Sequence, residues 1–152
     1  MDKEKKEAMS ASALGSVFEI SLRILLMLKE LFPSKLDEQQ IGALDFASVY
    51  AADFGLLDEN LHGYGDYRFS EYPARKHMVN SALRNLVLDG YVRLSPTPTG
   101  YRYSITEAGM GVCKQLDSDY AEEYIIAIHA VLDSFNGVNA KAMLKEINEL
   151  TI

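Results

Sequence analysis

The sequence predicts a mainly helical α+β fold with one two-stranded hairpin, and three observations support this prediction. Apolar residues recur at helical spacing over most of the chain. Two short strand-like runs, 91–94 and 101–105, flank a turn rich in Pro, Thr and Gly. A helical run precedes this pair and another follows it, so the order from residue 73 onward is helix, strand, turn, strand, helix. That order is typical of a winged helix-turn-helix with a two-stranded wing, here with additional C-terminal helices.

Length and composition fit one ordinary globular domain. The chain has 152 residues, of which 48% are hydrophobic and 24% charged. The longest apolar run, 24–28, is too short to span a bilayer, and the mixed-charge N-terminus has no apolar signal region, so we expect a cytoplasmic protein. The expected organisation is a flexible N-terminus (1–15), a winged-helix domain (16–135) and a C-terminal amphipathic helix (136–152).

The first two helices are predicted from their caps and apolar stripes. Ser16 suits the N-cap of a helix that ends before Pro33, and Asp37 suits the N-cap of the next helix. Asp45 falls at an inward position of this second helix, where a buried carboxylate needs a partner. Arg75 or a backbone N–H could supply that partner. We expect Asp45 and Arg75 to form a structural pair that holds the start of the third helix.

The third helix and the hairpin are delimited by proline and glycine. Pro73 suits the first turn of the third helix, and Gly90 suits a left-handed cap at its end. The turn of the hairpin is expected over 95–100, because its two prolines cannot donate to a sheet. Thr106 caps the next helix. The last third is expected to be helical, with breaks at 117–119 and at Asn136-Gly137.

A long loop over 55–72 combines glycines with aromatic residues. Loops of this length in a compact domain are usually functional or mobile. Its aromatic side chains could stack on bases, anchor a protein interface or fill the underside of the loop itself. The interface and the filling interpretations both remain open. The expected partner-binding residues are Tyr64, Tyr67, Phe69 and Tyr72 of the loop, with Ile147 and Leu150 of the C-terminal helix.

Charge is distributed unevenly along the chain. The net charge is −7, yet residues 68–104 contain six basic and two acidic residues. An acidic protein is repelled by nucleic acid at long range, while a local basic face can still attract it. We therefore expect weak, salt-dependent DNA binding at most. The candidate DNA-binding residues are Arg75, Lys76, Asn80, Arg84, Arg93 and Arg102.

Patterns that carry catalysis or metal binding are missing from the sequence. His62, His77 and His129 have no Cys partner and no His-Glu-x-x-His spacing. Cys113 is the only cysteine, and a small apolar filler on a helix is its expected role. The glycines near His62 resemble a phosphate loop but lack its Lys-Ser/Thr and a preceding strand. We expect a protein that is not an enzyme and needs no metal or cofactor.

Four stretches carry a resemblance to a known family: 61–76 (LHGYGDYRFSEYPARK), 90–92 (GYV) with Leu83 and Leu86 before it, 100–109 (GYRYSITEAG) and 116–121 (LDSDYA), with Leu44-Asp45 upstream. Together they resemble the middle component of bacterial ABC-three-component (Lamassu-type) anti-phage systems over roughly residues 16–135. The Thr-Glu-x-Gly part is shared by many winged-helix proteins. The His-Gly loop that runs into Glu71 and Arg75, and the later Leu-x-Ser-x-Tyr-Ala, are more particular.

The resemblance implies a small non-enzymatic subunit that joins an SMC-like ABC ATPase to an effector, often a nuclease. It would couple DNA sensing to that effector and would be similar to the small winged-helix subunits of SMC complexes. Its partners would be the ATPase, the effector and, as a further candidate, double-stranded DNA, without a membrane. The alternative is a winged-helix transcriptional regulator, with 73–89 as recognition helix and 120–135 as dimer contact.

Overall fold

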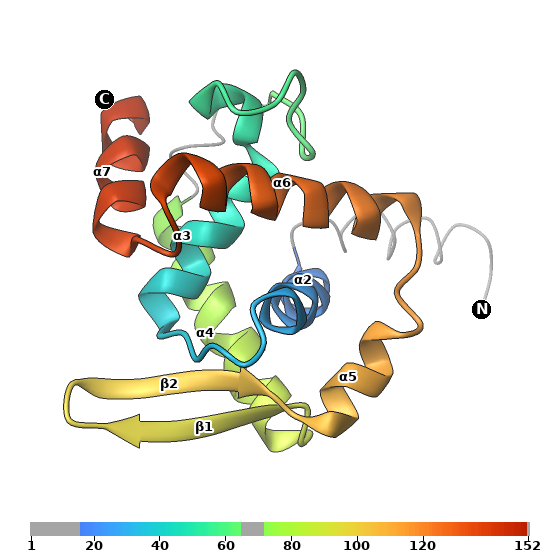
Figure 1. Ribbon diagram of the computed structural model, residues 1–152. Coiled ribbons are helices and arrows are strands. Elements are labelled where there is room, and N and C mark those ends of the chain that lie inside the picture. Colours follow the sequence, from blue (N-terminus) through green and yellow to red (C-terminus); the bar gives the residue numbers. More distant parts are fainter. Residues whose placement is uncertain (1–15, 65–71, 152) are drawn as a thin grey trace.

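The computed structural model describes residues 16–64 and 72–151, and their fold is mainly helical with one antiparallel hairpin, which confirms the predicted fold class (Figure 1). The elements in chain order are α2 (Val17–Glu30), α3 (Glu38–Val49), the 3-10 helix η1 (Ala51–Phe54), α4 (Tyr72–Leu88), β1 (Val92–Thr97), β2 (Gly100–Ile105), α5 (Glu107–Cys113), α6 (Asp119–Phe135) and α7 (Ala140–Thr151). The helix–strand–strand–helix order from α4 to α5 is winged-helix-like.

The predicted helix caps are present. Ser16 Oγ accepts a hydrogen bond from Glu19 N at 3.2 Å, at the start of α2. Asp37 forms a capping box with Gln40 at the start of α3: its Oδ1 accepts from Gln40 N at 2.7 Å, and Gln40 Oε1 accepts from Asp37 N at 2.9 Å. Thr106 Oγ1 accepts from Gly109 N at 3.1 Å and donates to Gly90 O at 2.7 Å. Thr106 therefore starts α5 and also fixes the end of α4.

The hairpin is longer, and its turn tighter, than the sequence predicted. The register runs from Val92↔Ile105 to Thr97↔Gly100, so the loop between the strands contains only 98–99 instead of 95–100. Pro96 pairs with Tyr101 inside the ladder. A two-stranded sheet consists of two edge strands, and an edge position tolerates the missing N–H of proline. The hairpin is tied to the helices through Leu36, which exchanges backbone hydrogen bonds of 3.0 and 2.7 Å with Tyr103.

The hydrophobic core surrounds α2, which lies between α6 and the hairpin (Figure 1). Its apolar residues Ile20 and Ile24 to Leu28 are almost fully buried, and Leu22 is partly buried. Helices α4, α5 and α6 all pack on α2, and α7 packs on α3. At the base of the hairpin, α5 approaches so closely that a Cβ on Gly109 would collide with the carbonyl oxygen of Tyr91. None of the helices described is long and apolar enough to cross a bilayer.

Candidate functional site

A buried ion pair between α2 and α3 lies at the centre of the helical core. Arg23 Nε lies 2.8 Å from Asp45 Oδ1, and Arg23 Nη2 lies 3.1 Å from Asp45 Oδ2. The guanidinium therefore donates hydrogen bonds to both carboxylate oxygens in a bidentate arrangement. Arg23 is 1% exposed and Asp45 2% exposed. Two parallel hydrogen bonds of this kind are among the strongest polar contacts in proteins. The pair therefore locks the relative position of α2 and α3.

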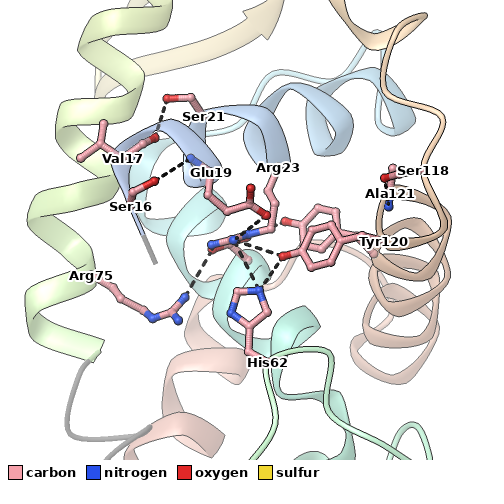
Figure 2. A network of polar contacts seen from close by, with 12 residues as sticks. Ser16, Val17, Glu19, Ser21, Arg23, His62, Arg75, Ser118, Tyr120 and Ala121 are labelled. Atoms are coloured by element: carbon pink, nitrogen blue, oxygen red, sulfur yellow. Dashed lines mark hydrogen bonds and ion pairs between the residues drawn. The ribbon is translucent and has the colours of Figure 1, made fainter. Parts of the chain in front are cut away.

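The same pair is connected to α6 and to the loop after η1 (Figure 2). Tyr124 OH donates to Asp45 Oδ1 at 2.6 Å. Arg23 Nη1 donates to Tyr120 OH at 3.3 Å, and this hydroxyl is hydrogen-bonded to His62 Nε2. If the Tyr120 hydroxyl accepts from Arg23 and donates to an unprotonated Nε2 of His62, all three groups have matching donor and acceptor roles. The network thus joins α2, α3, α6 and the loop that carries His62.

Arg75 approaches the network from α4 at a longer distance (Figure 2). Its Nη1 lies 4.0 Å from Asp45 Oδ2, at the outer limit of an ion pair, and makes no hydrogen bond. Its Nη2 donates to Tyr50 OH at 3.4 Å, and the guanidinium lies over the ring of Tyr50, 5.5 Å from its centroid. The expected Asp45–Arg75 contact is therefore the longer of two: Arg23 makes the short bonds to Asp45.

The electrostatics of the network fix its charges at neutral pH. Burial alone would raise the pKa of Asp45, but the charge and hydrogen bonds of Arg23 hold it below the ordinary value. Burial, followed by the positive charges of Arg23 and Arg75, lowers the pKa of His62 to about 4. Burial raises the pKa of both Tyr120 and Tyr124. The network therefore holds a charged Arg–Asp pair, a neutral histidine and protonated tyrosines.

This arrangement holds α2, α3 and α6 together. Asp45 and Tyr124 are too deeply buried to meet a substrate. Within 16–64 and 72–151, no group of three or more His, Cys, Asp or Glu side chains could hold a metal ion. A buried polar network of this kind favours one packing arrangement, because any other would leave charges unpaired. We interpret it as the structural centre that positions the exposed surfaces.

Sequence reasoning identified Asp45 as a buried carboxylate but missed its main partner, Arg23. A signal for Arg23 was present, because it falls on the buried stripe of α2, between Ile20 and Met27. An arginine in such a stripe needs a carboxylate. The roles of His62 and Tyr120 had no such signal, since they meet only through the tertiary fold.

The candidate DNA-binding residues divide into exposed and buried groups. Lys76, Asn80 and Arg84 are exposed and follow one another at intervals of four along α4, so they share a face. Arg93 on β1 is exposed, and Arg102 on β2 is partly exposed, with Nη1 3.4 Å from Lys35 O. Arg75 points into the core instead. Its place among the exposed DNA-binding residues was wrong, because position 75 lies on the inward face of α4.

The expected partner-binding residues also fall into an exposed and a buried group. Tyr64 is 51% exposed and Leu150 40% exposed, whereas Tyr72 is 7% and Ile147 0% exposed. Ile147 was expected on the exposed part of the C-terminal stripe, and this expectation was wrong. Tyr72, which was expected in the loop, is the first residue of α4 and is buried, as in the filling interpretation of the loop aromatics. The Tyr72 ring packs edge-on against Phe46, with centroids 5.0 Å apart, and Ile147 belongs to the core between α7 and α3. Tyr67 and Phe69 lie outside the described residues.

Asn60, which the sequence did not single out, organises the loop after η1. Its Oδ1 accepts from Ala52 N at 2.8 Å and from Asp53 N at 3.2 Å. Its Nδ2 donates to Asp53 Oδ2 at 2.7 Å and to Gly63 O at 3.0 Å. A single buried amide thus ties both ends of the loop together. The exposed ring of Tyr64 is joined to it, because Asn60 N donates to Tyr64 OH at 3.2 Å.

The fold and these surfaces define a small, mainly helical, winged-helix-like module whose buried polar centre joins α2, α3 and α6. The family model for ABC-three component (ABC-3C) system Middle Component 2 matches residues 13–152. The chain belongs to this family. Membership implies that it works with the other components of an ABC-3C system. No curated protein and no solved structure matches the chain.

Proposed function

We propose that this chain is a non-enzymatic accessory subunit of an ABC-3C anti-phage defence complex, in which it joins an SMC-like ABC ATPase to an effector. The observation that supports this most strongly is the family match over residues 13–152. The described fold is compatible with the proposal, and the function itself is argued from the surfaces that the fold carries. The small-subunit role follows from the resemblance in the sequence.

A joining subunit needs two separate contact surfaces, and charge separates two on this chain. The exposed face of α4 carries Lys76 and Arg84, and no acidic residue occurs within α4. Helix α6 carries Asp119, Glu122, Glu123 and Asp133, and no lysine or arginine. The hairpin that follows α4, with Arg93 on β1 and Arg102 on β2, lies on the other side of α2 from α6 (Figure 1). Partners of opposite charge could therefore bind without overlapping.

The second candidate is a winged-helix DNA-binding regulator, and the face of α4 favours it. Lys76, Asn80 and Arg84 are residue types that contact base edges and phosphates. Such a helix could also bring DNA to the defence complex. The net charge of −7 opposes strong independent binding. We therefore rank the accessory subunit first.

Co-expression tests the proposal. The tagged full-length chain would be expressed with the other components of its system, purified under mild conditions and compared with a tagged unrelated protein. We expect it to retain at least one other component in fixed ratio, together with ATPase activity in the recovered complex. Recovery of the chain alone would contradict the proposal. Selective binding to an operator by the chain alone would favour the regulator instead.

A further inference from the structure

An apolar hollow with a carboxylate rim lies between α6 and the loop after η1. It has a volume of about 250 Å³, and its floor is formed by Leu57, Leu61, Ile126 and Ala127. The rim carries Asp58 and Glu59 from the loop and Glu123 from α6. Asn60 lines the hollow as well, and we call these eight residues the Ile126 groove. Figure 1 shows the loop lying directly alongside α6.

Ile126 is unusual for its position. Its side chain is 58% exposed, although it lies in the middle of a helix whose other face is fully buried. The next residues on the same exposed face, Glu122 and Glu123, are charged and exposed. A large aliphatic side chain surrounded by carboxylates matches the general plan of a binding site, with an apolar centre and a polar rim.

Among the described residues that line the groove, every charged side chain is acidic. Neither the described segment 50–64 nor α6 contains a lysine or arginine. Arg23, which reaches Tyr120 of α6, is buried and paired with Asp45, so it does not neutralise the rim. Nucleic acid and anionic membranes would be repelled by such a surface. A segment with positive charges on both sides of an apolar side chain would be attracted.

The groove is also preorganised before any partner binds. Asn60, one of its lining residues, holds the loop by four hydrogen bonds of its side chain, and His62 N donates to Val49 O at 3.2 Å. Helix α6 is held in place by the hydrogen bonds of its Tyr120 and Tyr124 to Arg23 and Asp45. A surface that is already ordered loses little entropy when a partner binds.

We propose that the Ile126 groove binds a basic segment of a partner protein, in which one large apolar side chain is flanked by lysines or arginines. The apolar side chain would cover Ile126 and Leu57, and the flanking cations would face Glu59 and Glu123. This inference rests on the proposed function only for the identity of the partner, a component of the same ABC-3C system. The preference for a basic segment with an apolar side chain follows from the residues that line the groove and does not depend on the proposed function.

A defined peptide tests the groove without reference to the system. The full-length chain, labelled with nitrogen-15, would be titrated with a blocked pentapeptide that has a central leucine between two pairs of arginines. We expect amide shifts confined to the groove and its neighbours. A matched peptide with a central serine should bind at least about tenfold more weakly. Shifts spread evenly over all acidic surfaces, α7 included, would overturn the proposal, as would equal binding of the two peptides.

Variants separate an apolar contact from attraction by charge alone. Ile126→Asp adds a negative charge, so a purely electrostatic site would bind the leucine peptide as well or better. We expect weaker binding instead, by about tenfold or more. Glu59→Lys/Glu123→Lys should weaken binding as strongly and flatten its salt dependence. The matched controls are Glu146→Lys/Glu149→Lys on α7 and Leu88→Asp on α4, all exposed positions that should have little effect.

The same variants, tested with the purified components of the ABC-3C system, separate this inference from the proposed function. If a component binds the wild type and loses affinity with Ile126→Asp but not with Leu88→Asp, both stand. If it binds all variants equally, the groove is not the contact, and the proposed function is unaffected. If no component binds the wild type, the proposed function fails, and the peptide titration alone decides the groove. Unchanged circular dichroism and melting temperature would show that each variant is folded.

Discussion

A single buried carboxylate, Asp45, joins three helices of the core. It accepts short hydrogen bonds from Arg23 of α2 and Tyr124 of α6, while Arg75 of α4 stays 4.0 Å away. Replacing a whole buried ion pair by apolar residues often costs little, but removing one partner leaves a buried charge without compensation. The geometry therefore indicates which single substitutions destabilise the fold most.

We expect Asp45→Ala to destabilise the fold by about 3–5 kcal/mol, and Arg23→Met to do nearly the same. Arg75→Met should cost less, because its Nη1 makes no hydrogen bond and its distance to Asp45 is long. Urea denaturation monitored by circular dichroism gives these values. A double-mutant cycle should show stronger coupling of Asp45 with Arg23 than with Arg75. The reverse order would contradict the network described here.

The stability of the fold should depend on pH through His62. Its pKa of about 4 in the folded chain lies below its ordinary 6.5, so the unfolded chain binds the proton more readily. Stability is then complete above pH 6.5 and decreases as the pH falls toward 4. The difference of about 2.5 units corresponds to at most about 3 kcal/mol, reduced by partial exposure of the ring.

Urea denaturation between pH 7 and about pH 4.5 measures this effect. His62→Gln should flatten the dependence in that range, whereas His77→Gln, at an exposed position of α4, should retain it. Asp45 contributes in the same direction only at lower pH, because its folded pKa lies below 3.8. An unchanged pH profile in His62→Gln would show that its proton is not linked to folding.

At the scale of elements, local signals were predicted well and tertiary ones were not. The caps at Ser16, Asp37 and Thr106 depend on residues three positions apart, so the sequence alone revealed them. The extent of the hairpin depends on pairing across the strands, and Pro96 was consequently assigned to the turn. Which residues of an apolar stripe stay exposed depends on the neighbouring helices, and Ile147 was misplaced for that reason.

Two glycines of α5 give a matched test of how this helix packs on the hairpin. A Cβ at position 109 would collide with Tyr91 O and lie 2.7 Å from Ile105 Cγ1, whereas one at position 111 would meet nothing within 4 Å. We expect Gly109→Ala to cost about 2 kcal/mol or more. Gly111→Ala should raise stability by about 0.5–1 kcal/mol, the helix-propensity gain of alanine. Equal melting temperatures for the two variants would contradict the packing of α5.

The exposed cations of α4 and the hairpin should determine any binding to DNA. Four of the candidates, Lys76, Arg84, Arg93 and Arg102, remain accessible. Neutralising about four phosphates gives a log–log salt slope of roughly −3.6. Lys76→Ala/Arg84→Ala should reduce its magnitude by about 2, while Arg75→Met should leave the slope unchanged because its charge is buried. Fluorescence anisotropy with a short duplex measures the slope. Tight, sequence-selective binding at physiological salt would favour the regulator hypothesis.

At the scale of the whole molecule, one buried polar centre supports two surfaces of opposite character. The sequence predicted the basic middle of the chain, because charge can be counted along it. The acidic groove could not be found in this way, since Glu59 and Glu123 meet only when the loop packs against α6. Arg23, His62 and Tyr120 come from equally distant positions. Contacts between residues so far apart in the sequence can be identified only from the three-dimensional structure.

The proposed role of this chain is that of an accessory subunit in an ABC-3C complex. Its most direct test is size-exclusion chromatography with light scattering, on the purified chain mixed with the other components of its system. We predict a single species whose mass equals a whole-number combination of this chain and at least one other component. Elution of every component at its own separate mass, across component concentrations and with ATP present, would contradict that claim.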